Sequence, residues 1–217
     1  MARETYEAEL NSLREQMLKL SHMTGRALER SIVVLRDRLF EDGEKLIEED
    51  EAINLVCHHV EEGCLNIIAT QQPVAGDLRF IFATMQIAME LERIADYAKG
   101  IAVINRRITP GEHIKPLMDI PRMRQKAGEM LGLAMDAFLR CDLEAARRVP
   151  SMDVEINLLY EQVYRELVTR VMENPERIAD AMLLTFAAHN LERVGDRVIN
   201  ICERVVYLCT GDVVDMS

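Results

Sequence analysis

The 217-residue chain contains no tryptophan, and its five tyrosines and five phenylalanines make up only 5% of the sequence. Glycine (10) and proline (6) are also scarce. β-Sheets are enriched in aromatic and β-branched residues, and folds with many turns need glycine and proline. The composition therefore argues against a sheet protein and favours long helices that pack against one another.

The chain also has fewer basic than acidic residues, and it has no long apolar run. There are 26 Lys and Arg against 37 Asp and Glu residues, a net charge of −11. Such a chain repels a phosphate backbone, so no nucleic-acid partner is expected. The longest stretch without a charged residue covers fourteen residues, 63–76, and includes Pro73. Because about 20 apolar residues are needed to span a bilayer, no transmembrane helix is expected.

The N-terminus and the cysteines point to a cytoplasmic protein. The first residues, MARETYEAEL, carry charges from the start and contain no apolar signal core. Five cysteines is an odd number, and a chain of this length does not need disulfides to fold. Cys57 and Cys64, like Cys202 and Cys209, are seven residues apart. On a helix that is about 10 Å, too far for a shared zinc ion, so core packing is expected for them.

Apolar residues recur at intervals of three and four along most of the chain, which predicts amphipathic helices. Asp42 and Asp142 are each expected to cap the helix that follows. Thr109-Pro110-Gly111 opens the only cluster of proline and glycine, and it marks a linker at about 109–115. The predicted helices cover approximately residues 4–40, 44–72, 74–107, 121–140, 143–173 and 175–210.

The second half of the chain repeats the first. LERIADYAKGIA at 91–102 returns as LERVGDRVINIC at 191–202, an offset of 100. Asp50-Glu-Ala-Ile-Asn54 returns as Asp153-Val-Glu-Ile-Asn157, an offset of 103. We therefore predict an all-α fold of two tandem, sequence-related three-helix bundles with six long antiparallel helices. The first bundle is expected at 1–108 and the second at 116–217.

The repeated segments carry acidic residues at helical spacing. Glu92 precedes Asp96 by four positions, and Glu192 precedes Asp196 in the same way. Residues four apart share a helix face, where like charges oppose each other by a few tenths of a kcal/mol. The sequence makes this choice twice, which indicates a functional site. Its candidate residues are Asp50, Asn54, Glu92, Asp96, Asp153, Asn157, Glu192 and Asp196.

The spacing to the helix turns predicts that these residues converge. Asn54 lies 19 residues before Pro73, and Glu92 lies 19 residues after it. In an antiparallel hairpin both are roughly 28 Å from the turn, at a rise of 1.5 Å per residue. Asn157 and Glu192 are likewise about 17 or 18 residues from the turn at Asn174-Pro175. Each half is thus expected to gather three carboxylates and one amide oxygen.

Oxygen ligands alone suit hard cations, so we expect divalent or trivalent metal ions: iron, manganese or magnesium, with zinc as a further candidate. His189 has no counterpart in the first half and is not counted as a ligand. The alternative is an ordinary solvated face. Arg93 and Arg193 each precede an aspartate of the repeat by three positions and could pair with it.

Signs of catalysis are weak in the sequence. None of the five histidines follows a glutamate by three positions, as di-iron bundle enzymes require. No additional acid or base recurs at matched positions in the two halves. We therefore expect a protein that is not an enzyme. A metal-dependent hydrolase or redox enzyme, or a metal-storage bundle, remains the alternative.

QQPVAGDLR (71–79), LERIAD (91–96), LERVGD (191–196) and the duplicated layout resemble the PhoU regulators of phosphate uptake. The resemblance implies a cytoplasmic homodimer that represses phosphate uptake and the phosphate-starvation response. It implies contacts with a sensor histidine kinase and the ATPase of the phosphate ABC transporter, and a link to the membrane only through these partners. It also implies metal clusters held by the two Glu-x-x-x-Asp pairs. Ala95 departs from the glycine more common in the family, and we expect this methyl group to leave the ligands intact.

Overall fold

The computed structural model describes residues 2–114 and 117–216. In this part of the chain there are six long α-helices and no strand, which confirms the all-α expectation. None of the helices so described has an apolar stretch long enough to cross a membrane. The elements are α1 (Ala2–Asp37), α2 (Phe40–Gln71), α3 (Ala75–Arg107), α4 (Asp119–Arg140), α5 (Leu143–Glu173), the 3₁₀ turn η1 (Pro175–Arg177) and α6 (Ile178–Thr210).

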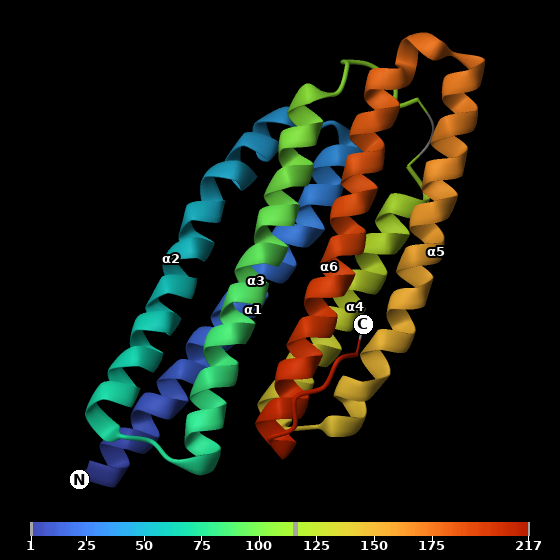
Figure 1. The fold of residues 1–217 in the computed structure, drawn as a ribbon. Coiled ribbons are helices and arrows are strands. Elements are labelled where there is room, and N and C mark those ends of the chain that lie inside the picture. Colours follow the sequence, from blue (N-terminus) through green and yellow to red (C-terminus); the bar gives the residue numbers. More distant parts are fainter. Residues whose placement is uncertain (1, 115–116, 217) are drawn as a thin grey trace.

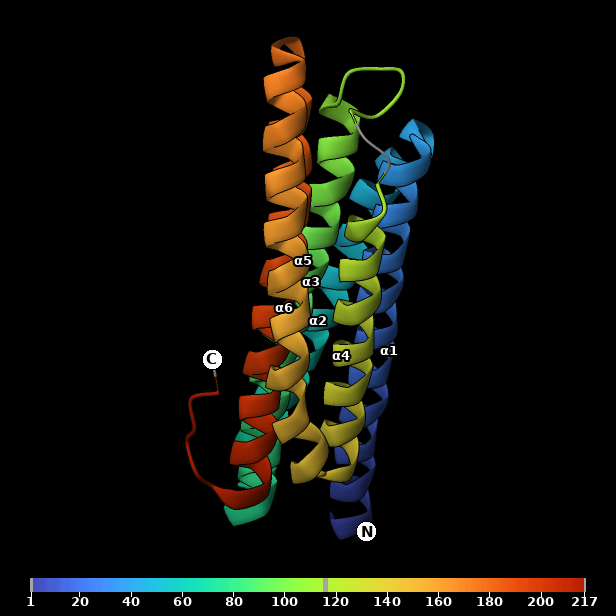
Figure 2. The ribbon, with the colours of Figure 1, turned by 90° about the vertical axis from the view of Figure 1, so that its right-hand side faces the viewer.

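Successive helices run in alternating directions and form two bundles side by side (Figure 1). α1, α2 and α3 pack together, as do α4, α5 and α6. α3 and α6 lie next to each other in the centre, while α2 and α5 lie on the outside (Figure 1). The view turned by 90° shows α4 beside α1 (Figure 2). The predicted pair of three-helix bundles is therefore confirmed.

A single hydrophobic core runs through both bundles. Leu91 and Ile94 of α3 and Leu191 and Val194 of α6 are completely buried members of it. At the α3–α6 contact, a β-carbon on Gly100 would lie 2.9 Å from Nδ2 of Asn190, so the absence of a side chain permits this close approach. The division into domains at 1–108 and 116–217 stays a prediction, because burial is shared across that boundary.

Of the two aspartates predicted to cap a helix, one does so in the structure and the other does not. Asp142 caps α5, and its Oδ1 accepts a hydrogen bond from the Ala145 backbone N–H at 3.0 Å, as predicted. The cap predicted at Asp42 is wrong, since α2 begins earlier, after Leu39. Asp42 lies in the first turn of α2 and pairs with Lys45 at 3.0 Å. An acid in a first turn is favourable without being the cap.

The linker predicted at 109–115 is tied to the second bundle, although residue 115 lies outside the described residues. The Thr109 backbone N–H donates to Oδ1 of Asp180 at 3.0 Å. Asp180 is buried, and Arg177 pairs with its other oxygen at 3.0 Å. These bonds hold the end of α3 against the start of α6.

The core-packing prediction holds for three of the four cysteines. Cys57, Cys64 and Cys202 are buried and free. It is wrong for Cys209, which forms a disulfide with Cys141 across a Cα–Cα distance of 5.7 Å. The two cysteines are 68 residues apart, so helical spacing offered no sign of their contact.

Candidate functional site

The first cluster, defined as Asp50 and Asn54 of α2 with Glu92 and Asp96 of α3, is brought together by the α2–α3 hairpin. Burial and the charges of Asp96 and Asp50 raise the pKa of Glu92. Burial and the charge of Asp50 raise the pKa of Asp96. Acids on opposite flanks of a bundle would not oppose each other in this way. Asp50, Glu92 and Asp96 thus lie on the same flank of the bundle, as the distances counted from Pro73 predicted, but their side chains do not form a group that could hold a metal ion.

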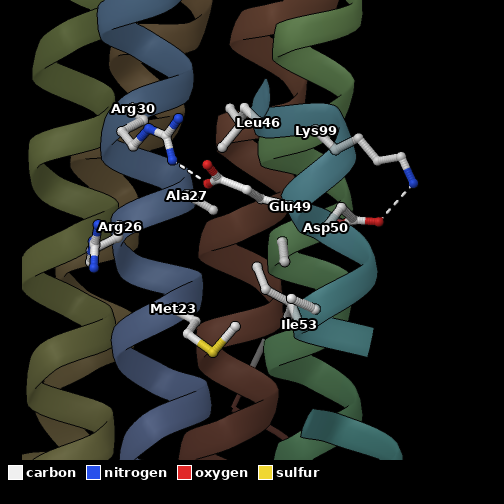
Figure 3. A pocket seen from close by; sticks show the side chains of 11 residues that line it. Met23, Arg26, Ala27, Arg30, Leu46, Glu49, Asp50, Ile53 and Lys99 are labelled. Atoms are coloured by element: carbon white, nitrogen blue, oxygen red, sulfur yellow. Dashed lines mark hydrogen bonds and ion pairs between the residues drawn. The ribbon is translucent and has the colours of Figure 1, made fainter. Parts of the chain in front are cut away.

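Asp50 is the buried aspartate of the first cluster, with 3% of its surface exposed. Lys99 of α3 donates from Nζ to its Oδ2 at 2.7 Å, as Figure 3 shows. Asn54 donates to the same oxygen over a longer 3.4 Å. Oδ1 is buried and has no hydrogen-bond partner among the residues described. The hydrogen bond to Asp50 raises the pKa of Lys99, so its ammonium group stays charged.

A cavity of about 230 Å³ lies beside this ion pair, between α1, α2 and α3. Its wall also carries an ion pair between Arg30 of α1 and Glu49 of α2 (Figure 3). Lys99, Asp50, Arg30 and Glu49 are thus already paired around the cavity, whereas Arg26, which also lines it, takes part in neither ion pair. Lys99 was missed by the sequence analysis, although its position three residues after Asp96, on the same helix, could have identified it.

The second cluster, defined as Asp153 and Asn157 of α5 with Glu192 and Asp196 of α6, has the same layout. Asp153 is 6% exposed, and Nδ2 of Asn157 donates to its Oδ2 at 2.8 Å. Burial and the charges of Asp196 and Glu192 raise the pKa of Asp153, outweighing the hydrogen bond from Asn157. The α5–α6 hairpin therefore also brings its acids together.

Asp153 depends on a glycine in the neighbouring helix. Its Oδ1 lies 2.1 Å from the position that a β-carbon on Gly195 would occupy. The same oxygen is buried and has no hydrogen-bond partner in the described part of the chain. Any other residue at this position would force the carboxylate to move. Gly195 therefore shapes the cradle in which the Asp153 carboxylate lies.

The outer acids of the second cluster are paired with basic residues. Asp196 contacts Arg193 at 2.9 Å, the pairing that the ordinary-surface alternative predicts. Oε2 of Glu192 lies 3.3 Å from Nδ1 of His189. In the first half the pattern differs, since Arg93 lies 3.6 Å from Glu90. The two copies of the repeat are thus not equivalent in their surroundings.

The metal prediction concerns the oxygen donors of the two clusters. As the side chains stand, the described residues include no group of three or more His, Cys, Asp or Glu that could hold a metal ion. In both clusters, however, the inner aspartate has a buried Oδ1 without a hydrogen-bond partner among the described residues, beside acids that repel one another. A hard cation would satisfy that oxygen and relieve the repulsion. Metal binding by the eight residues stays a prediction.

A second surface feature lies at the far end of the α5–α6 hairpin. The apolar groove, as we call it, has a volume of about 380 Å³. Sequence analysis missed it because its side chains lie outside the core stripes, although each helix contributes residues at intervals of four. Groups of exposed apolar side chains are typical of protein-binding surfaces. The exposed side chains that line it are Tyr164, Val168, Met172, Ile178, Met182 and Phe186.

Known proteins share this architecture. The family description "PhoU domain" matches the chain twice, at residues 17–104 and 120–205. The phosphate-specific transport system accessory protein PhoU of Serratia marcescens is 33% identical over 206 residues, which cover 95% of this chain and 85% of that protein. The crystal structure of PhoU from Pseudomonas aeruginosa has a TM-score of 0.89 at 31% identity, covering 95% of this chain and all of that one. The phosphate transport system regulatory protein PhoU of Streptococcus pneumoniae has the same TM-score at 28% identity, covering 97% and 99%.

Proposed function

Because the chain belongs to the PhoU family, we propose that it is an accessory protein of a phosphate-specific transport system that represses phosphate uptake and the phosphate-starvation response. The observation that carries this proposal is the match to both halves of the chain, 17–104 and 120–205, since a partial match would leave half of the molecule unexplained. Relatives across most of its length are named as accessory or regulatory proteins of phosphate transport. None of these names describes an enzyme.

In this proposal the protein is a cytoplasmic adaptor between the ATPase of the phosphate ABC transporter and a sensor histidine kinase. The six-helix scaffold and its continuous core give it a rigid body that can present fixed surfaces to two partners. Its net charge of −11 disfavours nucleic acid and favours partners with basic surfaces. Contact with the membrane would come only through the transporter.

The acidic clusters are proposed to hold divalent or trivalent metal ions, with iron, manganese or magnesium as the main candidates. Such an ion would supply positive charge between the helices of each hairpin. The residues of the chain provide the rest: Asn157 orients the Asp153 carboxylate through a 2.8 Å hydrogen bond, and the absence of a side chain at Gly195 leaves room for it. This role is structural and does not require turnover.

A homodimer is proposed on the same family likeness. The chain has a mass of 24.8 kDa, so light scattering coupled to size-exclusion chromatography should report about twice that value for the purified protein. A mass that stays at one chain across the concentration range would contradict the dimer.

The proposed function is tested in a strain that lacks the endogenous protein. Supplying this chain should restore repression of a phosphate-starvation reporter in phosphate-rich medium. Reporter activity that stays high despite normal levels of folded protein would overturn the proposal. A metal-dependent hydrolase, redox enzyme or storage bundle is the alternative. It would be favoured by metal-dependent turnover, or by the release of stored metal, that is lost with the acids of both clusters.

A further inference from the structure

Arg38, which follows the last residue of α1, has a buried guanidinium group without a partner. Its Nε, Nη1 and Nη2 are all buried, and none of them has a hydrogen-bond partner among the described residues. The side chain as a whole is only half-buried. A surface arginine usually covers apolar groups with its stem and keeps its charged head in water. Here the head is turned inward, where it needs acceptors that the described chain does not supply.

Three side chains from later in the sequence lie around this head. Nε2 of His113 in the linker lies 2.9 Å from the carbonyl oxygen of Leu35, at the same end of α1. Burial lowers the pKa of Arg38, and the charges of Asp180 and Arg177 act on it as well. The end of α1, the linker and the start of α6 lie at one end of the molecule (Figure 1). We call this group the junction cluster: Arg38, His113, Arg177 and Asp180.

The junction cluster has one positive charge in excess. Asp180 is its only acid, and both oxygens of that carboxylate already accept hydrogen bonds. Oδ1 accepts from the Thr109 backbone N–H at 3.0 Å, and Oδ2 accepts from Nε of Arg177 at 3.0 Å. Arg38 is therefore the cation left over. In a chain with 37 acidic residues, a buried cation that no acid reaches indicates an anion that comes from outside the protein.

His113 determines what else that anion must carry. The carbonyl oxygens of Leu35 and Arg36, at 2.9 and 3.3 Å from Nε2, can only accept, so Nε2 carries the hydrogen. Burial and the charge of Arg38 lower the pKa of the ring, which keeps it neutral near pH 7. Nδ1 is then an acceptor, and it is buried without a partner in the described structure. A matching ligand accepts hydrogen bonds from Arg38 and donates one to His113.

We propose that the junction cluster binds one inorganic phosphate ion. Phosphate offers several oxygen acceptors to a guanidinium group, and near pH 7 it keeps at least one proton that it can donate to Nδ1 of His113. Sulfate offers similar acceptors but no proton. A phosphate monoester loses its second proton at about pH 6. This site makes phosphate a direct ligand of the protein, which goes beyond the proposed accessory role.

The bound ion would connect the two halves of the chain. Arg38 belongs to the first bundle and Arg177 to the start of α6 in the second. Because the Arg38 head has no contact with solvent, phosphate reaches it only when part of segment 109–114 moves aside. That segment is held to the cluster by hydrogen bonds, among them one from Nη2 of Arg177 to the Glu112 carbonyl oxygen at 2.9 Å.

Isothermal titration calorimetry in a buffer without phosphate or sulfate tests the site. Inorganic phosphate should bind the unsubstituted protein with a dissociation constant below about 1 mM, and at least about tenfold more tightly than sulfate or glycerol 3-phosphate. Arg38→Met keeps the stem, removes the head, and should weaken phosphate binding at least about tenfold. Arg36→Met is the matched control, because Arg36 is exposed and pairs with Asp37 at 2.7 Å. It should leave binding within about twofold.

His113→Gln tests the requirement for a donor. The glutamine amide can still donate to the Leu35 carbonyl oxygen, but it leaves no acceptor in place of Nδ1. The preference for phosphate over sulfate should fall from at least about tenfold to less than about threefold. Phosphate should also raise the thermal midpoint of the unsubstituted protein and of Arg36→Met, but not that of Arg38→Met. Circular dichroism shows whether each variant is folded.

Three results would overturn the inference: no binding of inorganic phosphate at concentrations up to about 10 mM, equal losses from Arg36→Met and Arg38→Met, or tighter binding of sulfate or the ester than of phosphate. None of them would decide the proposed function. Repression of the phosphate-starvation reporter is measured in a separate assay, and its failure in the unsubstituted chain would count against the regulatory role alone.

Discussion

Asp153 of α5 lies directly against the backbone of Gly195 of α6, with its Oδ1 2.1 Å from the site of a missing β-carbon. Gly195→Ala should therefore lower the free energy of unfolding by about 1–3 kcal/mol, because the added methyl group overfills the contact and displaces a buried carboxylate. Urea denaturation followed by circular dichroism measures the loss.

Gly132→Ala is the control for this substitution. Gly132 is an exposed helical glycine of α4, and no described atom outside its own segment lies within 4 Å of a β-carbon built there. Alanine in this position should stabilise the protein by up to about 1 kcal/mol, through helix propensity. If both substitutions changed stability alike, the contact between Asp153 and Gly195 would have no energetic weight.

Two buried aspartates, Asp153 and Asp180, should make the stability of the protein change with pH in opposite directions. The pKa of Asp153 is raised from its ordinary 3.8, chiefly by burial. The folded protein thus holds this proton more tightly than the unfolded chain, and stability falls as pH rises from about 3.8 through the raised pKa. Asp153→Asn should remove this fall. Urea midpoints between about pH 3 and pH 7 measure it.

Asp180 provides the opposite case. Although burial disfavours its charge, hydrogen bonds from Thr109 and Arg177 outweigh burial and lower its pKa below 3.8. Its contribution to stability is present above the unfolded value of about 3.8 and is lost as pH falls through the lowered pKa. Asp180→Asn should therefore weaken the protein most near neutral pH and least in acid. A loss that is the same at every pH would show that packing, and not charge, is responsible.

The cysteines should fall into two classes in a thiol titration. Burial raises the pKa of Cys57 to about 11 and the pKa values of Cys64 and Cys202 to about 12. Because the thiolate is the reactive form, these three should react with a disulfide reagent only after denaturation. Cys141 and Cys209 should react in the native protein only after reduction.

Reduction of the disulfide should also lower stability. The bond joins residues 68 apart, and closing a loop of that length is worth about 4 kcal/mol in the chain-entropy estimate. Cys141→Ser with Cys209→Ser should reproduce the effect of reduction. If reduction and the double substitution left the urea midpoint unchanged, the bond would not contribute to folding.

Substitutions at a buried and at an exposed position of α6 should differ in their cost to stability. Leu184 is 1% exposed and Phe186 is 53% exposed. Leu184→Ala should cost about 2–5 kcal/mol through the cavity that it leaves, whereas Phe186→Ser in the apolar groove should cost less than about 1 kcal/mol. Thermal unfolding of both variants measures the contrast. A large loss at Phe186 would indicate that the apolar groove stabilises the fold itself.

The sequence predicted the features that depend on periodicity. Apolar spacing gave the helices, and the repeat gave two bundles. The count of residues from Pro73 placed Glu92 near Asp50, because rise per residue is nearly constant in a helix. The start of α2 was misplaced, since an acid in a first turn resembles a cap in sequence.

Contacts between distant side chains could not be read in the same way. The Cys141–Cys209 bond joins the end of α4 to the end of α6, and no spacing rule relates the two positions. The pairing of Lys99 with Asp50 depends on which way a long side chain turns. The packing of Asp153 against Gly195 depends on a close approach of α5 and α6 that only coordinates reveal. Periodicity specifies which face of a helix is buried, but not which atoms meet there.

The continuity of the core has a consequence for the history of this duplicated chain. Leu91 and Leu191 are completely buried members of one cluster, in the two central helices that pack against each other. A half expressed by itself would expose that aliphatic stripe to water, so an ancestor with a single copy of the repeat would have had to self-associate. Two copies in one chain make that pairing permanent. They also allow the surroundings of Asp50 and Asp153 to differ, as identical subunits of a symmetric dimer could not.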